Sequence, residues 1–196
     1  MNKDIMKHQM DMLKITPKDI SKHLDVGVSS VYRWLDGTTR NIPQEKQDRL
    51  AEILQLSSRA LDDDAQNLLK PILGNVKAGY NLYANEDLLG YEEVTELEAS
   101  KGDYYLKVQG DSMIGVGIFD GDLVYVKQCS EVENHKIAVV LVGEEVTIKK
   151  VIMKDDVLIL EAANQTVSNR FFNKNEIEVL PVRIIGQVLH SKRDFS

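Results

Sequence analysis

The stretch from Val108 to Asp122 constrains the fold of this chain more than any other. It reads V-Q-G-D-S-M-I-G-V-G-I-F-D-G-D, so that glycine–aspartate pairs stand near both of its ends. Glycine and aspartate tolerate the backbone angles of tight turns, and Gly110 and Asp111 therefore predict a turn with Ser112 at its tip. Directly afterwards, Leu123 to Val126 alternates as a strand would. We expect a β-structure in which Ser112 is held out from the sheet.

A second alternating segment, Glu145 to Val151, carries a lysine in an unusual place. Lys149 stands between Thr147 and Val151 on one face of this predicted strand, and both neighbours can lie against a core. A lysine that loses hydration there releases its proton more readily. A neutral lysine beside a serine hydroxyl can act as its general base. Ser112 and Lys149 are therefore a candidate pair, although the residues alone leave open a turn serine and a solvated strand lysine.

Histidine offers no better base. His8 and His23 lie in the helical first third of the chain, and His135 and His190 lie in polar contexts.

Three motifs in order resemble the self-cleaving domain of LexA, UmuD and the lambdoid phage repressors. They are P-I-L-G-N-V-K-A-G-Y, then G-D-S-M with G-I-F-D-G-D-L, then V-T-I-K-K. The resemblance covers about residues 70 to 192. It implies that Ser112 is the nucleophile, that Lys149 is the base and that the bond between Ala78 and Gly79 is cut. Backbone N–H groups around Ser112 and Met113 would then hold the developing oxyanion.

Composition excludes several other classes of protein. A length of 196 residues allows one or two domains, each with its own core. The single cysteine, Cys129, excludes a disulfide framework and suits a reducing cytosol. No apolar run approaches the roughly 20 residues that span a bilayer, and the start of the chain lacks the apolar region of a signal peptide. We expect a cytoplasmic protein away from the membrane, whose chemistry needs neither a metal nor a cofactor.

The net charge of −7 is unevenly distributed. Residues 1–60 hold ten Lys and Arg against eight Asp and Glu, which gives +2, and the remainder holds fourteen against twenty-three, which gives −9. The acidic balance belongs to the second part of the chain, so it does not argue against a nucleic-acid partner for the first part.

The first third of the chain is predicted to be helical. After a helix at Asp4–Leu13, Thr16 is an N-cap, with Pro17 in the first helical position and Asp19 three residues after the cap. The helix that they begin ends at the turn 25–27. Another helix, Val28–Leu35, follows at once, and two short helices joined by such a turn fit a helix-turn-helix.

The segment from residue 15 to 37 resembles the DNA-binding domain of phage repressors such as the lambda repressor. Asp25 replaces the usual turn glycine there, and aspartate still tolerates a left-handed backbone. The resemblance implies that the outward face of the third helix enters the major groove and that the loop after Gly37 contacts phosphates. The implied contact residues are Val28, Ser29, Tyr32 and Arg33 on the helix, and Thr38, Thr39 and Arg40 in the loop. A generic three-helix bundle is the alternative.

The remaining patterns predict further helices and strands. We expect a helix at Gln44–Leu54 and a fifth one that Ser57 or Ser58 caps. Strand patterns recur at Tyr104–Val108, Lys136–Val142, Val157–Leu160, Ile177–Leu180 and Arg183–Leu189. The last resembles the closing strand of the family, which usually contributes to dimerisation.

These observations predict a multidomain α and β chain. Residues 1–62 would form an all-α helix-turn-helix bundle, 63–72 a linker, and 73–196 a mostly β, LexA-like peptidase and dimerisation domain. The predicted function is a sequence-specific repressor of the LexA or prophage type, inactivated by Ser–Lys self-cleavage in the DNA damage response. Its implied partners are operator DNA, a second copy of the chain with higher oligomers left open, and a RecA filament. The alternative is a repressor of the same fold that an antirepressor protein switches without cleavage.

Overall fold

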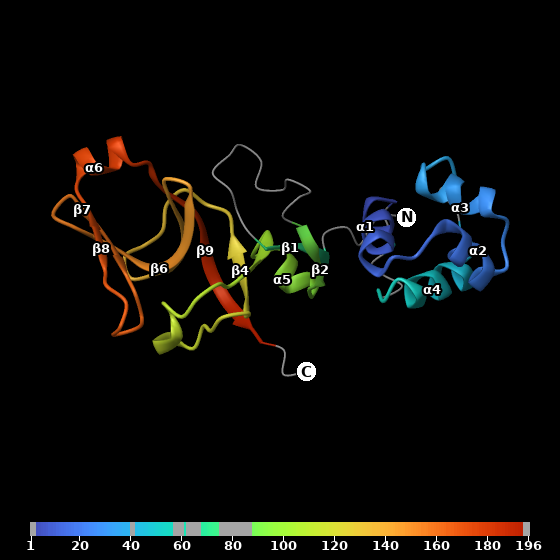
Figure 1. Cartoon of the computed structure of the whole chain (residues 1–196), viewed down its shortest axis with the longest axis horizontal. Helices are drawn as coiled ribbons and strands as arrows, with labels where there is room; N and C mark the ends of the chain where they lie inside the picture. Colours follow the sequence, from blue (N-terminus) through green and yellow to red (C-terminus); the bar gives the residue numbers. More distant parts are fainter. Residues whose placement is uncertain (1–2, 40–41, 57–60, 62–67, 75–87, 194–196) are drawn as a thin grey trace. The chain divides into compact units, whose positions relative to one another are not determined.

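The computed structural model describes residues 3–39, 42–56, 61, 68–74 and 88–193 (Figure 1). They form two compact units, one of Met1–Leu69 with Glu93–Ala99 and the other of Lys70–Glu92 with Ser100–Ser196. Helices dominate the first unit and strands the second, which confirms the predicted fold class. The predicted cleavage site Ala78–Gly79, Arg40, and the serines that would cap a fifth helix lie outside the described residues.

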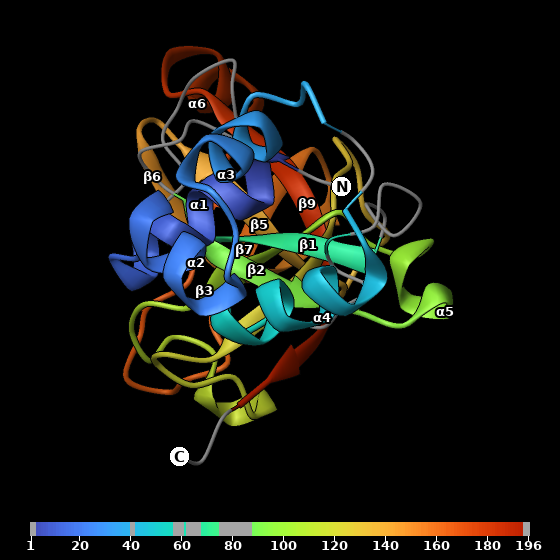
Figure 2. The same cartoon turned by 90° about the vertical axis from the view of Figure 1, so that its right-hand side faces the viewer.

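The first unit contains a bundle of helices around an apolar core. These are α1 (Lys3–Leu13), α2 (Pro17–Leu24), α3 (Val28–Leu35) and α4 (Gln44–Ile53), and α5 (Glu96–Ala99) is grouped with them. α2 packs against α3 and α4, and α1 packs against α3 (Figure 2). Each of α1 to α4 places at least one fully buried side chain in the core: Met6, Ile20, Val31 and Leu50. None of the helices in the described part of the chain is long and apolar enough to cross a membrane.

Short-range contacts explain why α2 and α3 form a helix-turn-helix. The predicted capping box is confirmed, because Thr16 Oγ1 accepts from the Asp19 N–H at 3.3 Å and Asp19 accepts from the Thr16 N–H at 2.9 Å. Asp25 ends α2 with φ 51° and ψ 55°, the left-handed backbone that the sequence predicts. Ser21 Oγ donates to the carbonyl of Val26 at 2.7 Å and so ties the turn back onto α2.

The second unit is built on a nine-stranded sheet with the order β2-β1-β3-β4-β9-β5-β6-β7-β8. In chain order the strands are β1 (Leu69–Leu73), β2 (Leu88–Glu93), β3 (Tyr104–Lys107), β4 (Leu123–Lys127), β5 (Ile137–Val142), β6 (Glu145–Lys154), β7 (Val157–Glu161), β8 (Arg170–Phe172) and β9 (Val182–Lys192). β1 pairs parallel with β3, so residues 69–72 of the predicted linker are part of the sheet. β9 lies between β4 and β5 and joins the two halves of the sheet (Figure 1).

Two apolar cores pack against this sheet. One gathers Tyr104, Val124 and Val139 with Met113 and Ile148, so it supports the segment that holds Ser112 and the strand that holds Lys149. The other gathers residues of β5, β7 and β8, including Val140, Leu160 and Phe172. The first core therefore positions the candidate site.

One predicted strand is wrong. Residues 177–179, from the segment predicted as a strand at Ile177–Leu180, are the end of helix α6 (Lys174–Val179). The Asn173 side chain accepts from the N–H groups of residues 175 and 176 at 3.0 Å, and Glu176 accepts from the Asn173 N–H at 2.8 Å. This capping box starts a helix just before the alternating residues, and local capping overrides their pattern.

Candidate active site

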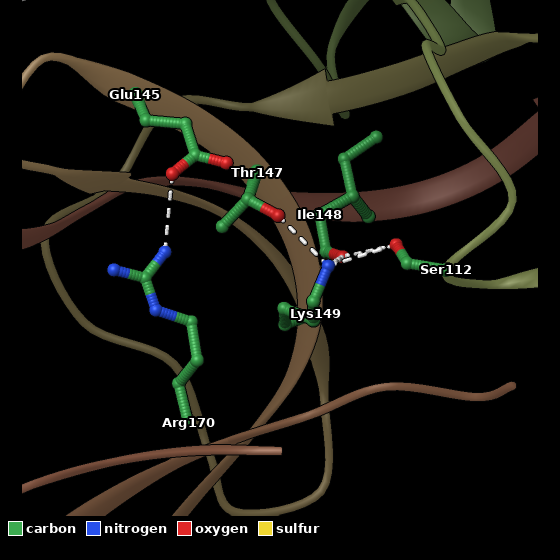
Figure 3. Close-up of polar contacts among 6 residues, drawn as sticks. All are labelled: Ser112, Glu145, Thr147, Ile148, Lys149 and Arg170. Carbon is green, nitrogen blue, oxygen red and sulfur yellow. Dashed lines mark hydrogen bonds and ion pairs between the residues drawn. The ribbon is translucent and has the colours of Figure 1, made fainter. Parts of the chain in front are cut away.

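Ser112 and Lys149 lie side by side, although they are 37 positions apart in the sequence (Figure 3). The Lys149 Nζ is 2.8 Å from the Ser112 Oγ. It is also 2.8 Å from the Thr147 Oγ1 and 3.0 Å from the carbonyl oxygen of Ile148. Three acceptors thus surround the amine, which matches the three N–H donors of an ammonium group.

Burial acts against that charge. Lys149 is only 6% exposed, so the alternative of a solvated strand lysine is wrong. Loss of hydration lowers the pKa of Lys149 from its ordinary value, while Glu145 raises this pKa and Arg170 lowers it further. Once neutral, the amine donates two hydrogen bonds and turns its lone pair to a third group. Thr147 and the Ile148 carbonyl can take the two donors, which leaves the lone pair for the Ser112 hydroxyl.

The turn that carries Ser112 is fastened to a neighbouring loop. The Gly115 N–H donates to the carbonyl of Ala163 at 2.6 Å, and the Asn164 Nδ2 donates to the carbonyl of Asp111 at 3.0 Å. A side chain at Gly115 would meet that Ala163 oxygen at 2.4 Å, so only glycine fits. Gly110 has φ +86°, in the left-handed region that the predicted turn requires. These contacts hold the turn, and Ser112 with it, in a fixed position against the loop at residues 163–164.

Met113 occupies the position predicted for an oxyanion donor. Its side chain is 2% exposed and packs into the core, which anchors its backbone beside Ser112. For its backbone N–H, no acceptor is found among the residues that the structure describes. This N–H is therefore a donor that a developing negative charge next to Ser112 can use.

A cleft of about 530 Å³ opens over the pair. The end of β3 and the Ser112 turn form one wall, and the first half of β6 forms the other. Gly74, the last described residue before the predicted cleavage site, also lines the cleft. The Gln109 Nε2 donates to the Gly74 carbonyl at 3.4 Å. The chain therefore leaves β1 at the edge of the cleft that contains Ser112.

Thr147 is a site residue whose role the sequence did not reveal. It shares a strand face with Lys149, and that alternation was the available signal. The contact with Nζ depends on the rotamer of a buried lysine, which no pattern specifies.

An ion pair between a buried carboxylate and an exposed arginine was also missed. Asp122 is 3% exposed, and its carboxylate accepts from Arg193 Nε at 2.6 Å and from Arg193 Nη2 at 2.7 Å. Hydrogen bonds from Arg193 are the main cause that holds the pKa of Asp122 below its usual value. Arg193 also lies over the ring of Phe119 at 4.0 Å and donates to the Gly117 carbonyl at 3.1 Å. The end of β9 is thereby tied to the segment that starts with the Ser112 turn.

Those predicted DNA-contact residues that the structure describes lie on one face of α3 and in the loop after it. Val28 and Tyr32 are 37% and 55% exposed, and Ser29, Arg33 and Thr38 are exposed as well. Thr39 is half-buried. The opposite face of α3, with Val31, Trp34 and Leu35, is buried as predicted. The predicted contact face of α3 is therefore the exposed one, and its opposite face belongs to the core.

Comparisons with known proteins agree with these features. Residues 71–189 match the model of the family described as Peptidase S24-like. The chain is 34% identical over 142 residues to a LexA repressor of Marinomonas sp., with 69% of each chain covered. It is 29% identical over 195 residues to a LexA repressor of Actinobacillus succinogenes, which covers 93% of this chain and 90% of that one. A LexA repressor of Thermotoga petrophila is 38% identical over 118 residues, 59% of each chain.

Proposed function

The chain belongs to the peptidase S24-like family. Because it is also similar to LexA repressors, we propose that it is a DNA-binding transcriptional repressor that cuts its own chain. The observation that carries the proposal is the Lys149 Nζ at 2.8 Å from the Ser112 Oγ, in a cleft that Gly74, four residues before Ala78, also lines. A charged, solvated lysine would not support this chemistry.

In the proposed reaction, neutral Lys149 takes the proton of the Ser112 hydroxyl while the serine oxygen attacks the carbonyl carbon of Ala78. Thr147 and the Ile148 carbonyl hold the two remaining N–H groups, which keeps the lone pair directed at Ser112. The Met113 N–H stabilises the oxyanion of the tetrahedral intermediate. The bond to Gly79 then breaks and the Lys149 ammonium protonates the leaving amine. Water, activated by the same lysine, hydrolyses the acyl-serine.

Chain length supports a cut within the same molecule. Ala78 is four residues beyond Gly74, and an extended chain spans about 3.3–3.6 Å per residue, so the Ala78 carbonyl lies within about 14 Å of the Gly74 position. Gly74 already lines the cleft. A tethered substrate reaches a high effective concentration, and the reaction must then be restrained by conformation or by the charge on Lys149.

Cleavage would end repression by separating two functions. In the intact protein, a dimer through the second domain would hold two copies of α3 over the half-sites of an operator. The exposed residues Val28, Ser29, Tyr32 and Arg33 would contact bases, and Thr38, Thr39 and Arg40 the phosphates. A cut at Ala78–Gly79 would release the DNA-binding part, which then binds without the effective concentration that linkage supplies. A RecA filament would promote the cut by favouring docking of the cleavage segment.

The test is incubation of the purified full chain at neutral and at mildly alkaline pH, with mass spectrometry of the products. Wild type should yield fragments 1–78 and 79–196, faster in alkali, because more Lys149 is neutral there. Ser112→Ala should yield neither fragment while it still binds operator DNA, and Ser130→Ala, an exposed serine outside the cleft lining, should behave as wild type.

Fragments that end at Ala78 in the Ser112→Ala protein would refute the nucleophile. Lys149→Arg should be inactive as well, because arginine does not give up its proton near neutral pH. A wild type that stays intact in alkali but binds operator would favour the other candidate, a repressor switched by an antirepressor protein.

A further inference from the structure

An ion pair of opposite charges stands at the rim of the Ser112–Lys149 cleft (Figure 3). Arg170, the first residue of β8, has its Nη1 3.2 Å from Oε2 of Glu145, the first residue of β6. Glu145 lines the cleft and shares a strand face with Thr147 and Lys149. The Arg170 side chain is 38% exposed and the Glu145 side chain 68% exposed, so the ion pair is in contact with solvent.

Other charged groups surround the cleft. Lys107 at the end of β3, Asp111 in the Ser112 turn and Glu144 before β6 line it. Lys150, which follows Lys149 on β6, forms a separate ion pair, with its Nζ 2.8 Å from Oε2 of Glu161 on β7. Glu145 and Arg170 are distinct because they act on Lys149 with opposite signs: Glu145 raises the pKa of the lysine and Arg170 lowers it.

We propose that Glu145 and Arg170 are positioning residues that act through their charge: they adjust the fraction of Lys149 that is neutral near neutral pH, and hence the resting rate of self-cleavage. The inference rests on the proposed function, since it takes Lys149 as the base. Neither side chain bonds to Ser112 or to the Lys149 amine among the contacts of the described residues. Their effect on the reaction is transmitted by the electrostatic field at the amine.

The two charges oppose each other in a definite way. The Arg170 guanidinium is always positive and disfavours a second cation nearby, whereas the Glu145 carboxylate favours it. While the ion pair is intact, the two contributions oppose each other at Lys149, and that of Glu145 is the larger. Removal of one member leaves the other unopposed, so the resting rate should move in opposite directions for the two single substitutions.

The experiment measures the first-order rate of self-cleavage of the full chain from neutral pH to strong alkali. The variants are Glu145→Gln, Arg170→Gln and the double substitution. Near neutral pH, Glu145→Gln should cleave about two- to threefold faster than wild type and Arg170→Gln about two- to threefold slower, the factor expected for one charge acting through a high dielectric. The double substitution should return the rate towards that of wild type. In strong alkali all four rates should converge, because Lys149 is then neutral in each protein.

Salt supplies a second readout. At about 1 M salt the Debye length falls to about 3 Å, so the differences between the variants near neutral pH should shrink. The matched controls are Glu133→Gln and Lys136→Gln, which break an ion pair outside the cleft lining with the same changes of charge. Both controls should follow the wild-type profile.

The inference fails if both single substitutions change the rate in the same direction, or if their differences persist in strong alkali and at high salt. Those results would mean that the two residues support the structure or hold the peptide. If instead neither the wild type nor any variant cleaves in alkali, the proposed function itself is refuted. Alkaline cleavage with unchanged profiles refutes only the role of the rim pair.

Discussion

Replacing Thr147 with valine removes one of the three acceptors around the Lys149 Nζ while it nearly preserves the shape of the side chain. The lost contact is 2.8 Å long. A hydrogen bond to a charged group contributes about 1.5–3 kcal/mol, and one between neutral groups about 0.5–1.5 kcal/mol. The charged lysine therefore loses about 1 kcal/mol more than the neutral lysine does. At about 1.4 kcal/mol per unit, the pKa of Lys149 should fall by somewhat less than one unit.

The same substitution should slow the chemical step. In the neutral lysine, Thr147 holds one N–H and so keeps the lone pair directed at Ser112. Without it the amine can rotate, and a small misplacement of a catalytic group costs up to about a hundredfold in rate. The pH–rate profile of Thr147→Val should therefore rise at lower pH than that of wild type but reach a plateau roughly ten- to a hundredfold lower.

The assay is self-cleavage of the full chain followed by gel densitometry over a range of pH. Thr147→Ser keeps the hydroxyl and is the matched control, with a profile close to that of wild type. A Thr147→Val profile with the wild-type midpoint and plateau would show that the hydroxyl neither stabilises the ammonium nor orients the amine. A midpoint that moves to higher pH would reverse the assigned direction and refute the reasoning.

Three further predictions concern other parts of the molecule. Gly115→Ala should slow self-cleavage by about tenfold or more while operator binding is unchanged, because the added Cβ has no room beside the carbonyl that accepts the Gly115 N–H. Asp122→Asn should lower the melting temperature at neutral pH and make the melting temperature less sensitive to acid. Arg193 lowers the pKa of the Asp122 carboxylate in the folded state. The carboxylate therefore stabilises the fold fully above its unfolded-state pKa, and this stabilisation is lost as the pH falls through its folded-state pKa. Arg33→Ala should weaken specific operator binding by about 1–3 kcal/mol and relax preference at one base position, whereas Arg40→Ala should weaken all sequences alike.

Each of these has a result that would contradict it. Undiminished cleavage by the Gly115 variant would mean that the turn tolerates a shift. A wild type and an Asp122 variant whose melting temperatures fall in parallel below about pH 4 would show that the carboxylate does not titrate with folding. Identical base preferences in the two arginine variants, measured by footprinting on mutated operators, would overturn their assignment to bases and phosphates.

Local chemistry explains what could be predicted from the sequence. The Thr16–Asp19 capping box, the left-handed Asp25 and the limits of α3 depend on contacts within a few residues, and all are confirmed. Strand alternation also placed Lys149 on a core-facing side of β6, where it is buried. The strand predicted at Ile177–Leu180 was wrong because two local signals compete there, and the capping box at Asn173 outweighs the alternating pattern.

Tertiary contacts explain what could not be predicted. The Asp122–Arg193 pair joins residues 71 apart, and nothing in the spacing of either links them. The Glu145–Arg170 pair depends on the order of β6, β7 and β8 in the sheet. Charged residues are common on strands, and only the folded sheet shows which of them meet beside the cleft.

The contacts of Lys149 also account for how its reactivity is restrained. Its three acceptors favour the ammonium, and its 6% exposure favours the neutral amine, so two large and opposite effects determine the protonation state. A peptide segment that fills the cleft displaces water and adds to the second effect alone. In the proposed mechanism, docking of the cleavage segment would bring the scissile bond to Ser112 and would raise the fraction of Lys149 that is neutral and able to take the serine proton, because desolvation lowers the pKa of the amine. A partner that stabilises the docked segment would thus raise the rate without supplying any catalytic group, and its effect should fade in alkali, where the lysine is already neutral.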